Sequence, residues 1–380
     1  MMHYDAIVLG VGGVGSAALF HLAKRGARVL GLERFEVAHD RGSSHGQTRL
    51  IRQAYFEHPD YVPLVKRAFE LWRELEQVCG QTLYDEVGLL EVGAPDGEVV
   101  RGVRASAREY DLPIENLSAA ETRKRFPQFH VDDACEAVFE TRAGYLLVEK
   151  CVQAHADAAV RHGAEIRTGE TVASWRADGS GVVVETDRGH YAADRLVVAA
   201  GAWSSALLAD LNIALEVRRK PIYWYATSGD GYRRENGSPG FYFDLPRGGF
   251  YGFPQLDDAG IKVAEHTGGE VVVDPLLVNR ELLADQQHVA EFVAEYLPQA
   301  TTRCTAHAVC MYTMTADGHF IVDRHPAHDQ IAFAAGLSGH GFKFVGVLGE
   351  ALSELALDGR TDLPVGFLAA DREGLRPGQD

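Results

Sequence analysis

The sequence predicts an α/β protein of two domains, in which a Rossmann-like dinucleotide-binding domain carries an inserted domain built on an antiparallel sheet. Three observations support this fold class. An apolar run at 5–10, a helix at 16–25 and a strand at 27–33 make a βαβ unit with glycines at its first turn. Aromatic-rich segments with hairpin signals fill residues 215–273. Residues 330–357 then return to a strand, a glycine loop and a helix.

The remaining elements follow from periodicity. Apolar residues recur at helical spacing over 61–78, and 150–162 is a further expected helix. The period changes to that of strands over 164–200, and another helix is expected over 281–296. We therefore predict a discontinuous nucleotide-binding domain and an inserted substrate domain, with these ranges: 1–85, 144–214 and 315–380 for the first, and 86–143 and 215–314 for the second.

Composition excludes several classes of protein. The 380 residues carry a formal net charge of −17, which argues against a nucleic-acid or anionic-membrane partner. The five cysteines are odd in number and form no C-x-x-C pair, so a disulfide framework is not expected and a reducing cytoplasm is the simplest compartment. No signal peptide or membrane-spanning run is recognised, and no metal site is predicted. We expect a cytoplasmic protein.

The strongest local motif is a dinucleotide fingerprint. Gly10, Gly12 and Gly15 form G-x-G-x-x-G between a strand and a helix, where glycines permit a tight turn and the close approach of a pyrophosphate. Glu33 ends the next strand, 18 residues after Gly15, where a carboxylate would accept hydrogen bonds from the adenosine ribose. The motif alone does not separate NAD from FAD.

Three further segments carry a family resemblance. They are GSSHGQTRLIRQAY, AVCMYTMTADGHFIVDRHP and GLSGHGFKFVGVLGE, which begin at Gly42, Ala308 and Gly336. With the fingerprint, they resemble the monomeric sarcosine oxidase and N-methyltryptophan oxidase family along nearly the whole chain. The resemblance implies covalent 8α-S-cysteinyl FAD, oxidation of N-methyl amino acids, reduction of oxygen to hydrogen peroxide, and a monomer.

The resemblance also implies how FAD is held. Cys310, in C-M-Y-T, matches the flavin-linking cysteine, and a thiolate is the nucleophile that this attachment needs. A lone cysteine in an apolar run is otherwise a small buried hydrophobe. The other cofactor-binding residues implied are Gly10, Gly12, Gly13, Val14, Gly15, Glu33, Arg34, Ser43, Thr48, Val172, Gly201, Gly339, Gly341, Phe342 and Lys343.

Two cations match the family's substrate carboxylate site. Arg52 lies in H-G-x-T-R-x-x-R, and a planar guanidinium can hold both carboxylate oxygens. Lys343 follows G-H-G-F at the start of the last helix, where a cation is locally unfavourable and a functional position is indicated. Tyr312 matches a pocket residue, and Tyr242 departs from the side chains expected there, so that it narrows or reshapes the pocket.

The remaining implied roles concern catalysis. Lys262 matches the lysine that activates oxygen, although an alternating strand alone would place it facing outward. Arg49 matches a residue against the flavin, and the other catalytic matches are His45, Tyr251 and His266. The expected reaction removes a hydride equivalent from an unprotonated amine. Water then hydrolyses the imine to an amino acid and formaldehyde.

Several alternatives remain open on the sequence. Within the family, the substrate is sarcosine, an N-methyl aromatic amino acid such as N-methyltryptophan, or a cyclic imino acid. A flavin-dependent amino acid dehydrogenase with a non-oxygen acceptor would share the fold. An NAD-dependent dehydrogenase would share the fingerprint but would need neither Cys310 nor the late glycine segment. A flavin-binding module without catalysis would not need the clustered charges.

Overall fold

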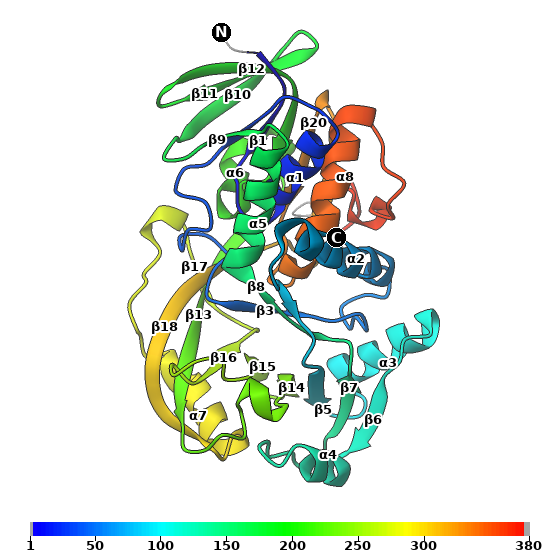
Figure 1. Ribbon diagram of the computed structural model, residues 1–380, viewed down its shortest axis with the longest axis vertical. Coiled ribbons are helices and arrows are strands. Elements are labelled where there is room, and N and C mark those ends of the chain that lie inside the picture. Colours follow the sequence, from blue (N-terminus) through cyan, green and yellow to red (C-terminus); the bar gives the residue numbers. More distant parts are fainter. Residues whose placement is uncertain (1–2, 376–380) are drawn as a thin grey trace.

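A mixed sheet with a parallel centre forms one half of the protein, which a computed structural model describes over residues 3–375 (Figure 1). Its eight strands run in the order β10-β11-β12-β1-β2-β9, with β20 beside β12 and β19 beside β20. The central pairs, β1 with β12 and β2 and β2 with β9, are parallel. The strands are β1 (His3–Leu9), β2 (Val29–Leu32), β9 (Glu165–Arg167), β10 (Val172–Asp178), β11 (Gly181–Thr186), β12 (Gly189–Val198), β19 (Ile321–His325) and β20 (His328–Ala335).

Helices cover this sheet because parallel strands must be buried on both faces. Helix α1 (Gly13–Lys24) packs beside α5 (Val148–Arg161) and α8 (Val345–Asp358), and α2 (Tyr61–Cys79) lies across α8. The close approach of α8 to α1 depends on Gly349, where an added Cβ would lie 2.6 Å from the Cβ of Ala17. The helix–sheet arrangement places the first turn of α1 directly at the carboxyl end of β1.

A nine-stranded, mostly antiparallel sheet forms the other half. Its order is β17-β13-β16-β15-β14-β5-β7-β6, with β18 paired to β13, and only β14 with β5 is parallel among these pairs. Its strands are β5 (Leu89–Gly93), β6 (Glu115–Ser118), β7 (Glu136–Glu140), β13 (Glu216–Thr227), β14 (Gly240–Leu245), β15 (Gly248–Phe253), β16 (Ile261–Glu265), β17 (Glu270–Val271) and β18 (Ala300–Met314). The predicted two-domain α/β architecture is confirmed.

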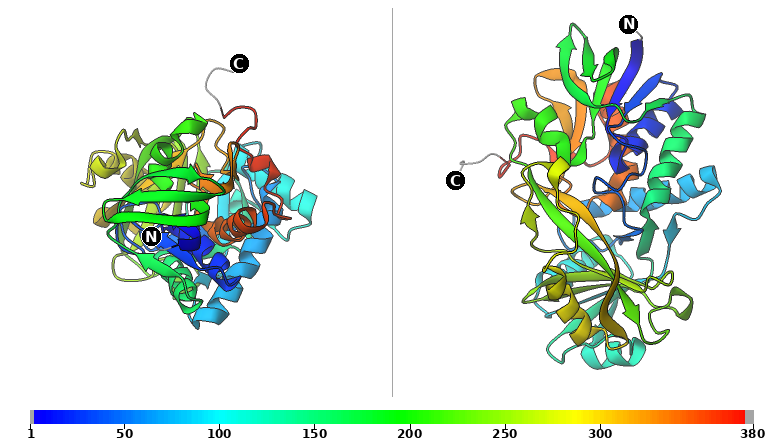
Figure 2. Two further views of the ribbon diagram at one scale, coloured as in Figure 1. Left: turned by 90° about the horizontal axis from the view of Figure 1, so that it is seen from above. Right: turned by 90° about the vertical axis from the view of Figure 1, so that its left-hand side faces the viewer.

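Short elements complete the fold. The helices α3 (Glu98–Tyr110), α4 (Ala119–Arg125) and α7 (Gln286–Tyr296) lie in the half that holds the antiparallel sheet (Figures 1 and 2). A third sheet, with the strand order β3-β8-β4, was not expected from the sequence. Its strands are β3 (Thr48–Ile51), β4 (Tyr84–Asp85) and β8 (Gly144–Leu147), and β3 carries Arg49 next to the segment that leads to Arg52. The remaining helical turns are α6 (Ser204–Leu207), η1 (Gly201–Trp203), η2 (Ala209–Leu211), η3 (Arg234–Asn236), η4 (Pro275–Leu277), η5 (Phe342–Phe344) and η6 (Gly366–Leu368).

One predicted helix was too long. The helix expected over 281–296 begins at Gln286. The guanidinium of Arg219 donates to the carbonyl oxygens of Asn279 and Glu281 and pairs with Asp285, which holds the preceding segment out of the helix. The residues at which one predicted domain gives way to the other stay a prediction. Among residues 3–375, no helix combines the length and apolarity that crossing a bilayer requires.

Candidate active site

One cavity runs from the carboxyl ends of β1 and β2 to the antiparallel sheet. It joins the glycine fingerprint to the side chains that the resemblance assigns to the substrate. Of the predicted site residues, these lie on its wall: Gly10, Gly12, Gly13, Val14, Glu33, Arg34, Ser43, Arg49, Arg52, Val172, Gly201, Tyr242, Tyr251, His266, Tyr312, Gly339, Gly341, Phe342 and Lys343. The predicted residues that are not on the wall are Gly15, His45, Thr48, Lys262 and Cys310.

The three fingerprint glycines fill different geometric roles. Gly10 has φ +87°, the left-handed region that favours glycine. A Cβ on Gly15 would lie 1.8 Å from the carbonyl oxygen of Gly10, so Gly15 permits α1 to meet the end of β1. A Cβ on Gly12 would meet nothing within 4 Å, because Gly12 faces the cavity. This open space at the N-terminus of α1 suits a pyrophosphate.

Glu33 lies where β2 ends, on the cavity wall. Its carboxylate accepts the backbone amides of Val11 at 2.8 Å and Phe35 at 2.9 Å. Burial alone would raise the pKa of Glu33, but hydrogen bonds from His39 and Phe35 hold that pKa below its usual value. An ionised carboxylate beside the glycine turn therefore remains able to accept ribose hydroxyls. These features fit the adenosine end of a dinucleotide.

Arg49, which is half-buried on the cavity wall, contacts the buried Cys310. The Arg49 guanidinium donates to the carbonyl oxygens of Ser43 and Thr48, both at 2.8 Å, and its Nη2 lies 3.0 Å from the Cys310 sulfur. Burial would raise the pKa of Cys310, but the positive charge of Arg49 and the contact with His45 lower that pKa to about 6. The charge of Arg49 therefore favours the thiolate of Cys310, the reactive form of cysteine.

Lys262 is buried behind Arg49. It is 1% exposed, so the outward position that strand alternation alone suggested is wrong. Its Nζ donates to the carbonyl oxygens of Gly46 at 2.6 Å and Thr48 at 2.8 Å and to the Thr48 hydroxyl at 3.0 Å. Three acceptors match the three protons of an ammonium. Burial, with the nearby charge of Arg49, lowers the pKa of Lys262 well below its usual value.

His45 and Thr48 contact Cys310 and Lys262, and neither lies on the cavity wall. The His45 carbonyl oxygen accepts from the Cys310 sulfur at 3.6 Å, and within residues 3–375 the buried His45 Nε2 has no hydrogen-bond partner. Thr48 directs both its oxygens at Lys262. The structure therefore brings Arg49, Cys310, Lys262, His45 and Thr48 into one cluster.

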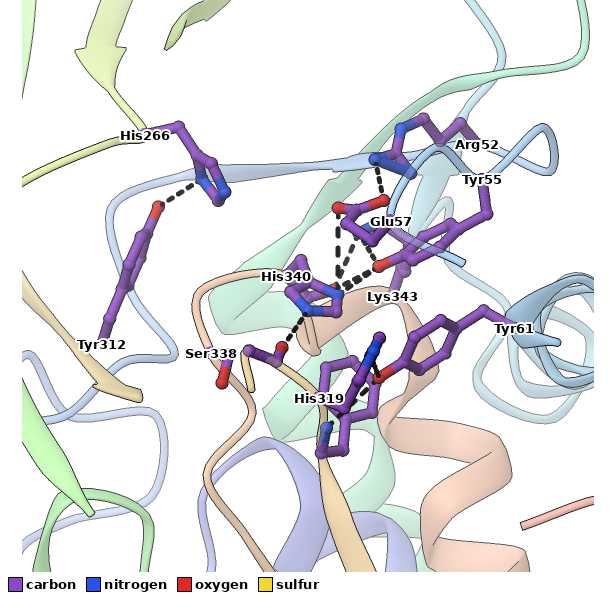
Figure 3. A network of polar contacts seen from close by, with 12 residues as sticks. Arg52, Tyr55, Glu57, Tyr61, His266, Tyr312, His319, Ser338, His340 and Lys343 are labelled. Atoms are coloured by element: carbon purple, nitrogen blue, oxygen red, sulfur yellow. Dashed lines mark hydrogen bonds and ion pairs between the residues drawn. The ribbon is translucent and has the colours of Figure 1, made fainter. Parts of the chain in front are cut away.

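Arg52 is enclosed by two carboxylates. Its Nη2 donates to Glu57 at 2.7 Å, and its Nε lies 3.2 Å from Glu91 (Figure 3 draws the Glu57 contact). The guanidinium also lies 4.3 Å from the ring centroids of both Tyr55 and Phe56. Such contacts fix the plane of the cation. Arg52 is thus held in place with Nη2 bonded to Glu57, while among residues 3–375 its buried Nη1 has no hydrogen-bond partner.

Lys343 is close to the same group. It lies in the turn η5 rather than in the first turn of α8, and Trp72 fixes that turn by donating to the Lys343 carbonyl oxygen at 2.9 Å. The Lys343 Nζ donates to the carbonyl oxygen of His340 at 2.8 Å (Figure 3). Burial, together with Arg52, lowers the pKa of Lys343 to about 7 despite the opposite effect of Glu57.

Aromatic side chains form the opposite wall. The Tyr312 hydroxyl lies 3.4 Å from His266 Nδ1 (Figure 3), and the Tyr242 and Tyr251 rings lie 5.9 and 6.3 Å from the His266 ring. Burial, assisted by the charge of Lys220, lowers the pKa of His266 to about 3. His266 is therefore neutral at physiological pH. The wall presents apolar faces and neutral polar groups to a ligand.

Sequence reasoning missed the acids and the second aromatic layer around Arg52. Glu57 follows Arg52 by five residues, and Glu91 interrupts an apolar strand, which is a signal for a functional or paired acid. Glu140 accepts the amides of Gln53 and Ala54 at 2.8 and 2.9 Å and shapes the segment that carries Arg52. Tyr55 and His340, which share a hydrogen bond, were also missed.

A separate cluster lies outside the cavity. Ligand atoms of Asp210, His325 and His328 lie within 4.8 Å of one another. His325 directs Nε2 to the Asp210 carboxylate at 2.9 Å, and its Nδ1 accepts the amide of Ala327 at 3.2 Å. Both ring nitrogens are engaged, which is the arrangement of a structural histidine rather than of a free metal ligand.

The comparisons with known proteins identify the family of the chain. A family model described as FAD dependent oxidoreductase matches residues 5–355, so the chain belongs to that family and FAD is its dinucleotide. The chain is 42% identical over 380 residues to monomeric sarcosine oxidase of Streptomyces avermitilis, across 98% of this chain and 99% of the relative. It is 36% identical over 365 residues to N-methyl-L-tryptophan oxidase of Escherichia coli O139:H28, across 95% and 97%.

A solved structure gives the same picture. The open form of NikD, described as an unusual amino acid oxidase, superposes with a TM-score of 0.85 and 25% identity over 97% of this chain and 98% of that one. Within the FAD-dependent oxidoreductases, the chain belongs to the sarcosine oxidase family. It is a flavoprotein oxidase of the sarcosine oxidase type.

Proposed function

We propose that the protein oxidises small N-methyl amino acids at the secondary amine and passes the electrons to oxygen. The observation that carries the proposal is the placement of Arg52 and Lys343 at one end of the cavity, opposite an aromatic wall, in a chain similar to sarcosine and N-methyltryptophan oxidases. Bound FAD would supply the acceptor for a hydride equivalent. The residues of the chain would supply orientation, charge and exclusion of water.

Arg52 and Lys343 would bind the substrate carboxylate. Both are buried cations on the cavity wall, and a carboxylate is the anion that an amino acid offers. Arg52 Nη2 donates to Glu57, but among residues 3–375 the buried Nη1 has no hydrogen-bond partner, so an incoming carboxylate would bind Nη1. Substrate binding would therefore add a carboxylate to a guanidinium that already contacts Glu57 and Glu91.

The aromatic wall would select the reactive form of the amine. Tyr251, Tyr312 and neutral His266 surround the cavity with weakly polar groups, and a low-dielectric surrounding disfavours a charged amine. An unprotonated secondary amine has the lone pair that loss of a hydride equivalent requires. Tyr242 lies on the cavity wall, where its ring would limit the size of the substrate. Small N-methyl groups suit that space.

Cys310 would attach the flavin covalently through its sulfur. The support is its contact with Arg49, which favours the thiolate that would attack the 8α carbon of the ring. The 8-methyl group would lose a proton, the new C–S bond would leave the flavin reduced by two electrons, and oxygen would reoxidise it. Cys151 offers a contrast inside the same chain, since burial without a neighbouring guanidinium raises its pKa well above the usual value. Attachment at Cys310 would set the ring between Arg49 and the aromatic wall.

Lys262 would assist the transfer of electrons to oxygen. Its support is a buried ammonium with three fixed acceptors beside Arg49 and Cys310, which is a preorganised positive charge near the proposed attachment point. Arg49 would add charge on the same side, and His45 and Thr48 would keep Lys262 and Cys310 in place.

The proposed oligomeric state is the monomer that the names of the sarcosine oxidase relatives state.

The proposal is tested by a product screen. Purified holoenzyme is mixed with sarcosine, N-methyl-L-tryptophan, L-proline and glycine, and both hydrogen peroxide and formaldehyde are measured. We expect equal amounts of the two products from N-methyl substrates and neither from glycine. Peroxide from glycine at a rate equal to that from sarcosine, or electron transfer only to an artificial acceptor, would contradict the proposal.

A further inference from the structure

Glu91 is an acid in contact with Arg52 that the reaction above does not use. It lies in the middle of β5, is fully buried, and pairs in parallel register with Tyr242 of β14 and in antiparallel register with Val138 of β7. A charged side chain in the centre of a sheet is rare unless it is paired. Its place in the strand, rather than a flexible loop, fixes the position of its carboxyl group.

The contacts of Glu91 are incomplete. Its nearest cation is Arg52, with Nε at 3.2 Å, yet among residues 3–375 neither Glu91 oxygen has a hydrogen-bond donor. Glu57, by contrast, accepts a hydrogen bond from the same guanidinium at 2.7 Å. A buried carboxylate without donors is much less stable as an anion than as a neutral acid. A negative charge on Glu91 is therefore stabilised by fewer hydrogen bonds than a negative charge on Glu57.

The two acids also differ in access. Arg52 and Glu57 line the cavity, but Glu91 does not, so Glu91 meets the guanidinium from outside the cavity. A ligand carboxylate can reach Arg52 Nη1, which is unpaired within residues 3–375, from the cavity but cannot reach the place of Glu91. Once that ligand is bound, Arg52 faces Glu57, Glu91 and the ligand. An ionised Glu91 would then repel the ligand in a low-dielectric site.

We propose that Glu91 is a positioning residue that takes up a proton when an anionic ligand binds beside Arg52, and so couples substrate affinity to pH. The inference rests on the proposed function, because it requires a carboxylate at Arg52. In the neutral form, Glu91 leaves the charge of Arg52 available to the ligand. In the ionised form, Glu91 pairs with Arg52 from outside the cavity and weakens the attraction between Arg52 and the ligand.

The charged neighbours support this assignment. Burial raises the pKa of Glu91 to about 8, Arg52 and Lys343 act in the opposite direction, and Glu57 and Glu140 raise it further. Tyr242, which faces Glu91 across the strand pair, has a pKa raised by burial and is neutral in this range. A ligand anion adds another negative charge and raises the pKa of Glu91 again. Ligand affinity therefore falls as pH rises through about 8.

The effect of Lys343 on ligand binding must be distinguished from that of Glu91, because both residues make ligand affinity fall as pH rises. Its pKa is about 7, so its ammonium is complete below that pH and is lost above it. A bound carboxylate stabilises the ammonium, so Lys343 also takes up a proton on binding above pH 7. Wild-type protein should therefore take up protons at two residues above pH 8, and each variant that lacks one of them should take up protons at the other.

The experiment measures methylthioacetate binding to the flavin-loaded protein between pH 6 and 9.5, from the perturbation of the flavin absorption spectrum. Each coupled proton changes the Kd about tenfold per pH unit. Above pH 8, we expect the slope of log Kd against pH to fall by about one in Glu91→Gln and by about one in Lys343→Met. Calorimetry in two buffers of different ionisation enthalpy measures the same proton uptake directly.

The outcomes separate this inference from the proposed function. If Glu91→Gln keeps the wild-type slope while Arg52→Met weakens binding, Glu91 is only a structural partner of Arg52 and the inference is wrong. If Arg52→Met and Lys343→Met both bind methylthioacetate as the wild type does, the carboxylate site itself is wrong. Should Glu91→Gln not fold, Lys343→Met with Glu91 intact decides the matter: no proton uptake at pH 8.5 overturns the inference, and uptake of about one proton supports it.

Discussion

The nucleotide end of the cavity is formed by backbone and glycine, whereas the substrate end is formed by buried charged and aromatic side chains. At the first end, the available space depends on missing Cβ atoms at Gly12 and Gly15. At the second end, the proposed function depends on contacts between residues far apart in the chain, such as Arg49 with Cys310, and Arg52 likewise contacts Glu91. Substitutions that add side-chain volume should therefore disturb the nucleotide end most. Substitutions that remove charge should disturb the substrate end most.

The largest effect is expected at the nucleotide end. Gly15→Ala would place a Cβ 1.8 Å from the Gly10 carbonyl oxygen, so α1 must move away from β1, and we expect loss of the folded, flavin-loaded protein. Gly12→Ala is the matched control, because its Cβ has no neighbour within 4 Å. Its apoprotein should unfold within about 0.5 kcal/mol of the wild type, while its FAD content falls. Equal stability of the two variants by thermal unfolding would contradict these separate roles.

A second prediction tests charge at the other end. Lys262→Met should slow reoxidation of the flavin by oxygen about 10²–10³-fold, since one preorganised electrostatic stabiliser typically contributes that much. Anaerobic reduction by substrate should change far less. Lys220 is a matched buried lysine that also donates to backbone carbonyls, those of Thr267 and Gly268. Stopped-flow traces in which Lys220→Met is slowed as much as Lys262→Met would refute a specific role for Lys262.

A third prediction concerns the carboxylate site and its pH dependence. A hydrogen bond to a charged group is worth roughly 1.5–3 kcal/mol, so Arg52→Met or Lys343→Met should weaken methylthioacetate binding by about one to two decades. Because the pKa of Lys343 is about 7, its contribution is complete below pH 7 and is lost as pH rises. The advantage of wild type over Lys343→Met should therefore shrink from pH 6 to pH 9. A constant ratio of the two Kd values across that range would contradict this assignment.

The smallest effect is expected from pocket shape. Tyr242→Leu removes a ring from the cavity wall and should raise kcat/KM for N-methyl-L-tryptophan relative to sarcosine by roughly tenfold, the scale of a small change in pocket volume. Tyr242→Phe keeps the ring and should leave that ratio close to the wild-type value. Steady-state rates with both substrates measure it, and an unchanged ratio in Tyr242→Leu would show that Tyr242 does not limit substrate size.

The same comparison explains what could be predicted from the sequence. Gly10, Gly12, Gly15 and Glu33 were found because a local motif between a strand and a helix defines their geometry. The two-domain architecture followed from a change of hydrophobic period, a signal that needs no tertiary information. The unexpected β3-β8-β4 sheet has strands too short to give a periodic signal.

The acids around Arg52 were not predicted for a different reason. Glu91 is set beside Arg52 by the pairing of β5 with β14 and β7, which no local pattern reveals. The burial of Lys262 likewise depends on the carbonyl oxygens of Gly46 and Thr48, more than 200 residues earlier. A family motif identified Arg49, Arg52 and Cys310, but only packing determines their partners.

The central proposal is that the flavin is joined at Cys310, which lies beside Arg49 and near Lys262. Intact-mass spectrometry of the denatured holoprotein tests it most directly. We predict a mass equal to polypeptide plus FAD for the wild type and for Cys151→Ala, the matched buried thiol, and the mass of bare polypeptide for Cys310→Ala. Bare polypeptide in flavin-loaded wild type, or retained FAD in Cys310→Ala, would contradict the claim.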